Sequence, residues 1–142
     1  MIKKFKAILK NPKKLPFFIS KVRAGFPSPA GDHVEKKMSL DERLIKRKSS
    51  SFYLQATGDS MIDVGITDNA ILLIDRSLEA RNGDIVVVSI NGDHTLKRYK
   101  KVGDKVFLYP ANPKYKPIEL KEGSDNILFG VVKAATNIYR DD

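Results

Sequence analysis

The chain has 142 residues, carries a formal net charge of +9 and contains no cysteine. This length suggests one domain with a substantial core, and the lack of cysteine excludes disulfides and thiol chemistry. The two histidines, His33 and His94, lie far apart and do not form the pattern of a zinc site, so we expect neither a metal nor a cofactor.

Nearly all of the excess positive charge lies at the start of the chain. Residues 1–24 hold eight basic and no acidic residues, whereas residues 25–142 carry a net charge of +1. The near-neutral body therefore does not predict nucleic-acid binding through overall charge. The apolar stretch "LPFFI" is too short for an export signal, and no apolar run is long enough to span a membrane. We expect a cytoplasmic protein without membrane contacts.

The first predicted element is a basic arm at residues 1–38. Within it, residues 2–10 place four apolar side chains on one helical face among lysines, and Pro12 ends that pattern. Two interpretations stay open: a frayed basic arm, or a short amphipathic helix that docks on a partner. The stretch "KVRAGFPSPAG", residues 21–31, can be neither a helix nor a strand within a sheet, which predicts an extended joint.

A second region, residues 39–142, is predicted to be the folded domain, and it begins with a short helix at 39–47. Ser39 and Glu42 form a capping box, in which the serine caps the helix and the glutamate reaches back. Leu40, Leu44 and Ile45 are expected to face inward.

The rest of the chain predicts a compact, mainly β domain. Short apolar or alternating runs, separated by turn residues every 8–12 positions, are typical of such folds. The predicted strands are residues 51–57, 70–75, 84–90, 94–102, 105–110 and 126–135. Asn91-Gly92-Asp93 predicts a tight hairpin between the third and fourth of these strands.

The most unusual turn is "ATGDSMIDVGI", residues 56–66. Glycine permits a sharp bend, and a serine held in such a bend exposes its hydroxyl. Ser60 is therefore a candidate nucleophile, with backbone N–H groups near it as candidate donors to an oxyanion. An ordinary Asp-Ser turn explains the same residues.

A nucleophilic serine needs a base, and no histidine stands in a triad pattern. A lysine can serve if burial keeps it neutral. Lys97 is a candidate because it lies in the middle of a predicted strand, but spacing does not separate it from Lys100 or Lys101. A solvated basic strand is the alternative.

Three separated strings carry a resemblance to a known family. They are "AGFPSPA" at 24–30, "GDSMID.GI" at 58–66 and "NGDHTLKR" at 91–98. In this order and spacing they resemble UmuD proteins, the accessory subunits of bacterial SOS mutagenesis polymerases. The last two strings more widely resemble the LexA-like self-cleaving Ser-Lys peptidases. The resemblance covers nearly all of residues 17–135 and implies a LexA-like peptidase domain.

The resemblance implies roles for individual residues. Ser60 takes the place of the nucleophile, Lys97 that of the general base, and the backbone N–H groups of Ser60 and Met61 those of the oxyanion donors. Self-cleavage is implied at Ala24-Gly25, immediately before "FPSP", so that the joint is the enzyme's own substrate. Ala30-Gly31 is a second possible bond.

The resemblance also implies partners and a biological role. It implies cleavage stimulated by a RecA–single-stranded-DNA filament, and a homodimeric product that joins a UmuC-like Y-family catalytic subunit in translesion synthesis. Two alternatives are a LexA-type transcriptional repressor and a non-catalytic polymerase scaffold. The short, proline-broken segment before residue 39 argues against a helix-turn-helix domain, so no sequence-specific DNA binding is expected.

Overall fold

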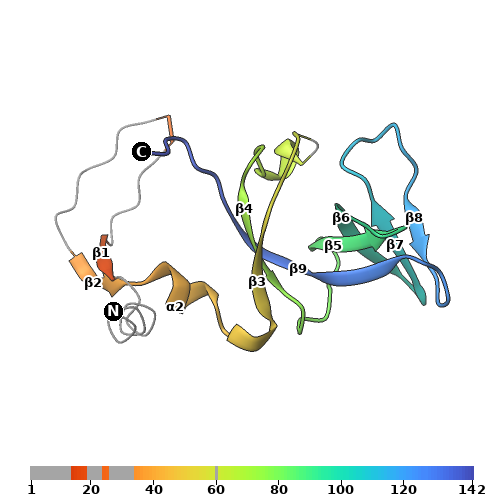
Figure 1. Ribbon diagram of the computed structural model, residues 1–142, viewed down its shortest axis with the longest axis horizontal. Helices are drawn as coiled ribbons and strands as arrows, with labels where there is room; N and C mark the ends of the chain where they lie inside the picture. The colour runs from red at the N-terminus through yellow and green to blue at the C-terminus, as the bar shows by residue number, and fades with distance from the viewer. Residues whose placement is uncertain (1–13, 19–23, 26–33, 60) are drawn as a thin grey trace. The chain divides into compact units, whose positions relative to one another are not determined.

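The computed structural model describes residues 14–18, 24–25, 34–59 and 61–142 (Figure 1). The chain divides into two units, residues 1–46 and 47–142. Residues 2–10, for which a helix was one of two interpretations, lie outside the described residues, as does Ser60.

The first unit contains a two-stranded antiparallel pairing that the sequence did not suggest. Strand β1 (Leu15–Phe18) pairs with β2 (Val34–Met38), with Leu15 opposite Met38. Pro16 is tolerated in β1 because a strand at a sheet edge does not need every N–H. The predicted joint therefore lies in the connection between two paired strands. Its described residues, Ala24 and Gly25, form a bend.

The predicted helix is present but shorter than expected, as α2 (Leu40–Leu44). Ser39 is its N-cap, and the Ser39 hydroxyl accepts a hydrogen bond from the Glu42 N–H at 3.4 Å. The Glu42 carboxylate instead lies 3.9 Å from Lys14 Nζ. Leu40 does not face inward, since 53% of it is exposed, whereas Leu44 is half-buried. No helix in the described part of the chain is long and apolar enough to cross a bilayer.

The second unit is built on one antiparallel sheet, which confirms the mainly β prediction. Seven strands of the described chain pair in the order β3-β4-β9-β5-β6-β7-β8. Their bounds are β3 (Ser51–Gln55), β4 (Ile71–Asp75), β5 (Ile85–Ile90), β6 (Asp93–Val102), β7 (Lys105–Tyr109), β8 (Ile118–Leu120) and β9 (Ile127–Thr136). The long strand β9 joins the two halves, because it pairs with β4 and with β5 (Figure 1).

The predicted strands agree with the observed ones to within two residues at each end, but β8 was not predicted. Two short 3-10 turns are also present. The first, η1 (Lys48–Ser50), precedes β3, and the second, η2 (Ile62–Val64), follows the Gly-Asp-Ser motif. The hairpin between β5 and β6 has a two-residue turn, Asn91-Gly92. Both residues have positive φ, 51° and 87°, as a type I′ turn requires.

The sheet buries a separate apolar cluster on each of its faces. One cluster contains Met61, Leu72 and Ile74 together with Val87, and Leu96 packs against it. The other contains Val86, Val88, Leu108 and Val131, and Tyr99 packs against it. Successive residues of β5 and β6 thus alternate between the two clusters, as the pleat demands.

The contact between β4 and β9 depends on the absence of a side chain at Gly130. A Cβ atom there would lie 2.6 Å from Cγ2 of the fully buried Ile74. Gly130→Ala is therefore expected to lower the free energy of unfolding by about 1–3 kcal/mol, the usual cost of overpacking. Urea denaturation measures this loss. Adding Ile74→Ala should make the two costs less than additive, and strict additivity would contradict the proposed clash.

Candidate active site

The turn that carries the Gly-Asp-Ser motif, residues 58–66, is fastened to the sheet before Ser60. Ala56 continues from β3 and exchanges hydrogen bonds with the facing chain, donating to the Ala70 carbonyl and accepting from the Asn69 N–H, both at 2.8 Å. Gly58 has φ +86°, and its N–H donates to the Asp68 carboxylate at 2.8 Å. The position two residues before the serine therefore needs a conformation that glycine adopts readily.

The turn is also fastened after Ser60. The Met61 side chain is buried in the apolar cluster. Asn137, beyond β9, receives hydrogen bonds from the Thr67 N–H and hydroxyl and donates its own side-chain N–H to the Gly65 carbonyl at 2.8 Å. The residues on both sides of the candidate nucleophile are thus held by the sheet.

Met61 carries the one predicted oxyanion donor that lies within the described residues. Its carbonyl accepts from the Val64 and Ile66 N–H groups, both at 3.2 Å. Within the described residues the Met61 N–H itself donates no hydrogen bond. An N–H held by a packed side chain and left without an acceptor can stabilise a developing oxyanion.

Burial distinguishes Lys97 from the other two candidate lysines. All three lie on β6, but Lys97 is half-buried, whereas Lys100 and Lys101 are exposed. In the register of the sheet Lys97 lies opposite Val86, which is fully buried. No ion pair of Lys97 occurs in the described part of the chain.

Alternation along the strand predicts that Lys97 shares a face with Thr95 and Tyr99, but it does not predict which apolar cluster that face contacts. Leu96 packs against the cluster that contains Met61, whereas Lys97, the next residue, lies on the other face of β6 with Thr95 and Tyr99. Met61, the residue after Ser60, and the candidate base Lys97 thus lie on opposite sides of β6. The structure does not bring Met61 and Lys97 together on one face.

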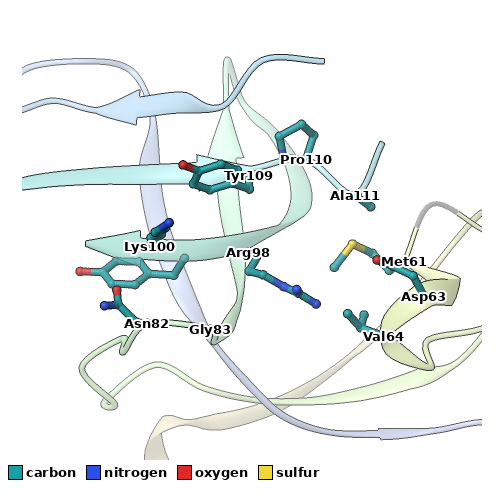
Figure 2. Close-up of a pocket in the computed structure, with 11 residues that line it drawn as sticks. Met61, Asp63, Val64, Asn82, Gly83, Arg98, Lys100, Tyr109, Pro110 and Ala111 are labelled. Atoms are coloured by element: carbon teal, nitrogen blue, oxygen red, sulfur yellow. The ribbon is translucent and has the colours of Figure 1, made fainter. Parts of the chain in front are cut away.

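Two cavities border the motif turn, and β6 contributes to both. One, of about 210 Å³, is lined by Gly58 and Met61 and by residues 94–96 of β6. The other, of about 590 Å³, is lined by Met61, Asp63 and Val64 and by residues 98–100 (Figure 2). Lys97 lies between the two stretches of β6. His94 is exposed and stacks on Phe129 with ring centroids 4.7 Å apart.

Strand β6 has an open edge beside the smaller cavity. Its pairing with β7 begins at Arg98, opposite Tyr109, so residues 93–97 pair only with β5 among the described strands. An open edge next to a nucleophile can receive an extended peptide as an added strand.

The predicted cleavage bond is on the surface of the first unit. Ala24 and Gly25 are both exposed, and Gly25 has φ +90°. The bond is thus in a bend and not in an extended segment at this point. The alternative bond, Ala30-Gly31, lies outside the described residues.

Comparisons with known proteins identify the family and several relatives of this chain. The family model described as Peptidase S24-like matches residues 16–133. The chain is 43% identical over 102 residues to the LexA repressor of Shewanella piezotolerans, which covers 72% of this chain and 49% of that protein. It is 34% identical over 119 residues to protein SamA of Salmonella typhimurium, which covers 84% of this chain and 82% of SamA. The chain thus spans about half the length of that LexA repressor but most of the length of SamA.

Proposed function

The chain belongs to the Peptidase S24-like family, and from this membership we propose that it is a serine peptidase that cleaves its own chain between Ala24 and Gly25. The observation that carries the proposal is the motif turn, which is held on both sides of Ser60 and lies beside β6. Ser60 and Lys97 are the proposed dyad, and the similarity to SamA extends over both positions and over most of that protein.

The proposed reaction is a two-step hydrolysis. The Ser60 hydroxyl attacks the carbonyl carbon of Ala24 while the neutral Lys97 amine accepts its proton. The oxyanion receives hydrogen bonds from the Ser60 and Met61 N–H groups. Lys97 then gives the proton to the leaving amine of Gly25, and water hydrolyses the resulting ester.

The substrate segment has a proposed place to bind. An extended stretch around Ala24 can pair with the open edge of β6 at residues 93–97, next to the cavity lined by Gly58 and Met61. The small side chains of Ala24 and Gly25 leave their peptide bond accessible. Because substrate and enzyme are tethered in one chain, proximity supplies part of the rate.

The proposed role follows from what the cleavage removes. The released arm takes eight positive charges with it, so the net charge falls from +9 to +1. We propose that a RecA–single-stranded-DNA filament accelerates the cut and that the product, as a homodimer, serves a UmuC-like Y-family polymerase in the SOS response. A change of this size in charge should by itself alter the partners that the protein attracts.

Incubation of the purified protein alone, from neutral to strongly alkaline pH, tests the peptidase proposal. The expected result is a product that begins at Gly25, detected by intact mass, whose rate of formation rises with pH because only an uncharged amine accepts a proton. A product that begins at Gly31 would move the cleaved bond but keep the chemistry.

The same incubation separates the peptidase from the two alternatives. If no product forms at any pH, and none forms when a RecA filament is added, the chain is a scaffold without peptidase activity. Specific binding to operator DNA in a gel shift would instead support a LexA-type repressor.

A further inference from the structure

The larger cavity beside β6 combines positive charge with aromatic rings. Its volume is about 590 Å³, which is within the usual range for a site that takes a small organic group. Figure 2 shows Arg98 and Lys100 on the β6 side of the cavity and Tyr109 on the neighbouring strand. None of these three residues has a part in the proposed cleavage.

The register of the sheet places these side chains on one face. Arg98 lies opposite Tyr109, and Lys100 lies opposite Phe107. Residues directly opposite one another in an antiparallel pair project from the same face, so two cations and two rings alternate across β6 and β7. The Lys100 Nζ lies 5.8 Å from the centroid of the Tyr109 ring.

The two cations of this face are available to a ligand. Arg98 and Lys100 are exposed, and neither forms an ion pair in the described part of the chain. Asp63 is the one acidic residue that lines the cavity, and it lies on the side of the motif turn (Figure 2). The near-neutral net charge of residues 25–142 therefore conceals a local excess of positive charge on this face.

The cavity wall beside β6 is held by hydrogen bonds. The Gly83 N–H donates to the Tyr99 carbonyl at 3.0 Å, and the Tyr99 N–H donates to the Asp84 carbonyl at 2.8 Å. Asn82 accepts from the Lys101 N–H through its side chain. The segment with Asn82 and Gly83, which lines the cavity, is thus tied along β6.

We propose that this cavity binds single-stranded nucleic acid without sequence preference. Arg98 and Lys100 bind successive phosphates, and a base stacks on the Tyr109 ring. A groove that pairs cations with aromatic side chains is the general device for holding single strands, because every base offers a π face. This activity goes beyond the proposed peptidase, and residues 25–142 retain it after the arm is removed.

The aromatic rings favour a nucleic acid over an acidic protein segment. Carboxylates would use the two cations and the Tyr109 hydroxyl but would gain nothing from the face of the Tyr109 ring. A nucleotide uses both kinds of group, and the cavity is large enough to admit a base between the strand and the motif turn.

Fluorescence anisotropy with a labelled dT strand tests the proposal. The strand has about 20 nucleotides, because single-strand-binding folds cover sites of about 4–16 nucleotides. The full chain is used with Ser60→Ala in every variant, so that the basic arm is always present and contributes equally. Arg98→Gln with Lys100→Gln should weaken binding and reduce the slope of log affinity against log salt by about 1.4, because each contact to a single strand contributes about 0.7. The matched control is Lys48→Gln with Lys116→Gln, two exposed lysines outside the cavity.

A pair of substitutions at Tyr109 tests the stacking. Tyr109→Phe keeps the ring and should bind as before, whereas Tyr109→Leu should bind about tenfold more weakly with an unchanged salt slope. A labelled rU strand of the same length tells whether DNA or RNA binds more tightly.

Three results would overturn the proposal. The first is an equal decrease in the salt slope for the control pair, which would mean that any two surface cations contribute equally to binding of the dT strand. The second is equal binding by Tyr109→Phe and Tyr109→Leu. The third is displacement of the dT strand by an oligoglutamate of equal charge as effectively as by unlabelled dT, which would assign the cavity to an acidic protein segment.

Discussion

Replacing Ser60 by alanine is expected to abolish the product that begins at Gly25, and replacing Lys97 should have nearly the same effect. The serine supplies the only proposed nucleophile, and loss of a general base costs typically 10²- to 10⁴-fold in rate. Lys97→Met keeps the length of the half-buried side chain but removes the amine. Lys97→Arg keeps the charge but cannot lose its proton. Both should be inactive, as measured by intact mass during incubation at alkaline pH.

The matched control is Lys101→Ala. Lys101 lies on the same strand and on the same face as Lys97, but it is exposed. The Lys101→Ala variant should cleave itself at the wild-type rate. Cleavage by Lys97→Met together with its loss in Lys101→Ala would contradict the assignment of the base. Cleavage by Ser60→Ala would remove the serine mechanism altogether. The urea midpoint of each variant shows whether a loss of activity reflects a loss of fold.

The elements that local chemistry determines were predictable from the sequence. The Asn91-Gly92 turn sets the register of β5 and β6, and the alternation of apolar residues along both strands agrees with that register. Ser39 begins α2 as its cap. These features depend on residues close together in the chain, where turn and capping preferences act directly.

Features that depend on distant residues were not predictable in the same way. The pairing of β1 with β2 joins segments separated by the whole joint. Pro16 lies within β1, and a proline argues against a strand when only the sequence is considered. Leu40 was assigned to the core because it lies at an apolar position of a capping box, yet α2 leaves it exposed. A five-residue helix has too few turns for its apolar spacing to define a buried face.

The candidate site shows the same division. The sequence predicts Ser60 and its turn as the candidate nucleophile. Spacing along the strand did not separate Lys97 from Lys100 and Lys101, and only the family resemblance pointed to Lys97, because strand burial depends on what packs against each face. The pairing of β6 with β5 places Lys97 opposite the fully buried Val86, and the pairing of β6 with β7 brings Tyr109 opposite Arg98 and leaves residues 93–97 with an open edge. The same pairing creates the cavity with Arg98 and Lys100, which the net charge of the body gave no reason to expect.

A buried carboxylate within the second unit was not predicted either. Asp75, at the end of β4, is fully buried. One of its oxygens accepts from the Ser77 hydroxyl at 2.7 Å, the Ser77 N–H at 2.9 Å and the Ser50 hydroxyl at 2.8 Å. The other oxygen accepts from Arg47 Nε at 3.1 Å. Asp75 thus joins β4 to the segment that leads into β3.

These donors make the charge of Asp75 a source of stability. The hydrogen bond from the Ser77 hydroxyl, then those from the Ser77 N–H and the Ser50 hydroxyl and the charge of Arg47, hold the pKa of Asp75 far below its usual range, although burial acts in the opposite direction. A carboxyl whose pKa is lower in the folded chain stabilises the fold above its unfolded pKa of about 3.9 and loses that contribution as the pH falls further.

Asp75→Asn is therefore expected to unfold at a lower urea concentration than the wild type at pH 7. The carboxylate accepts hydrogen bonds through two oxygens, whereas the amide of asparagine has only one acceptor oxygen. Its NH₂ group would point at groups that are themselves donors. Because the asparagine does not titrate, the difference in urea midpoint should shrink as the pH falls below about 4, where the wild type begins to lose the contribution of its carboxylate. Asp125→Asn, an exposed position, is the control and should follow the wild type at every pH. A difference that stays constant from pH 7 to pH 3 would mean that Asp75 stabilises the fold by its shape and not by its charge.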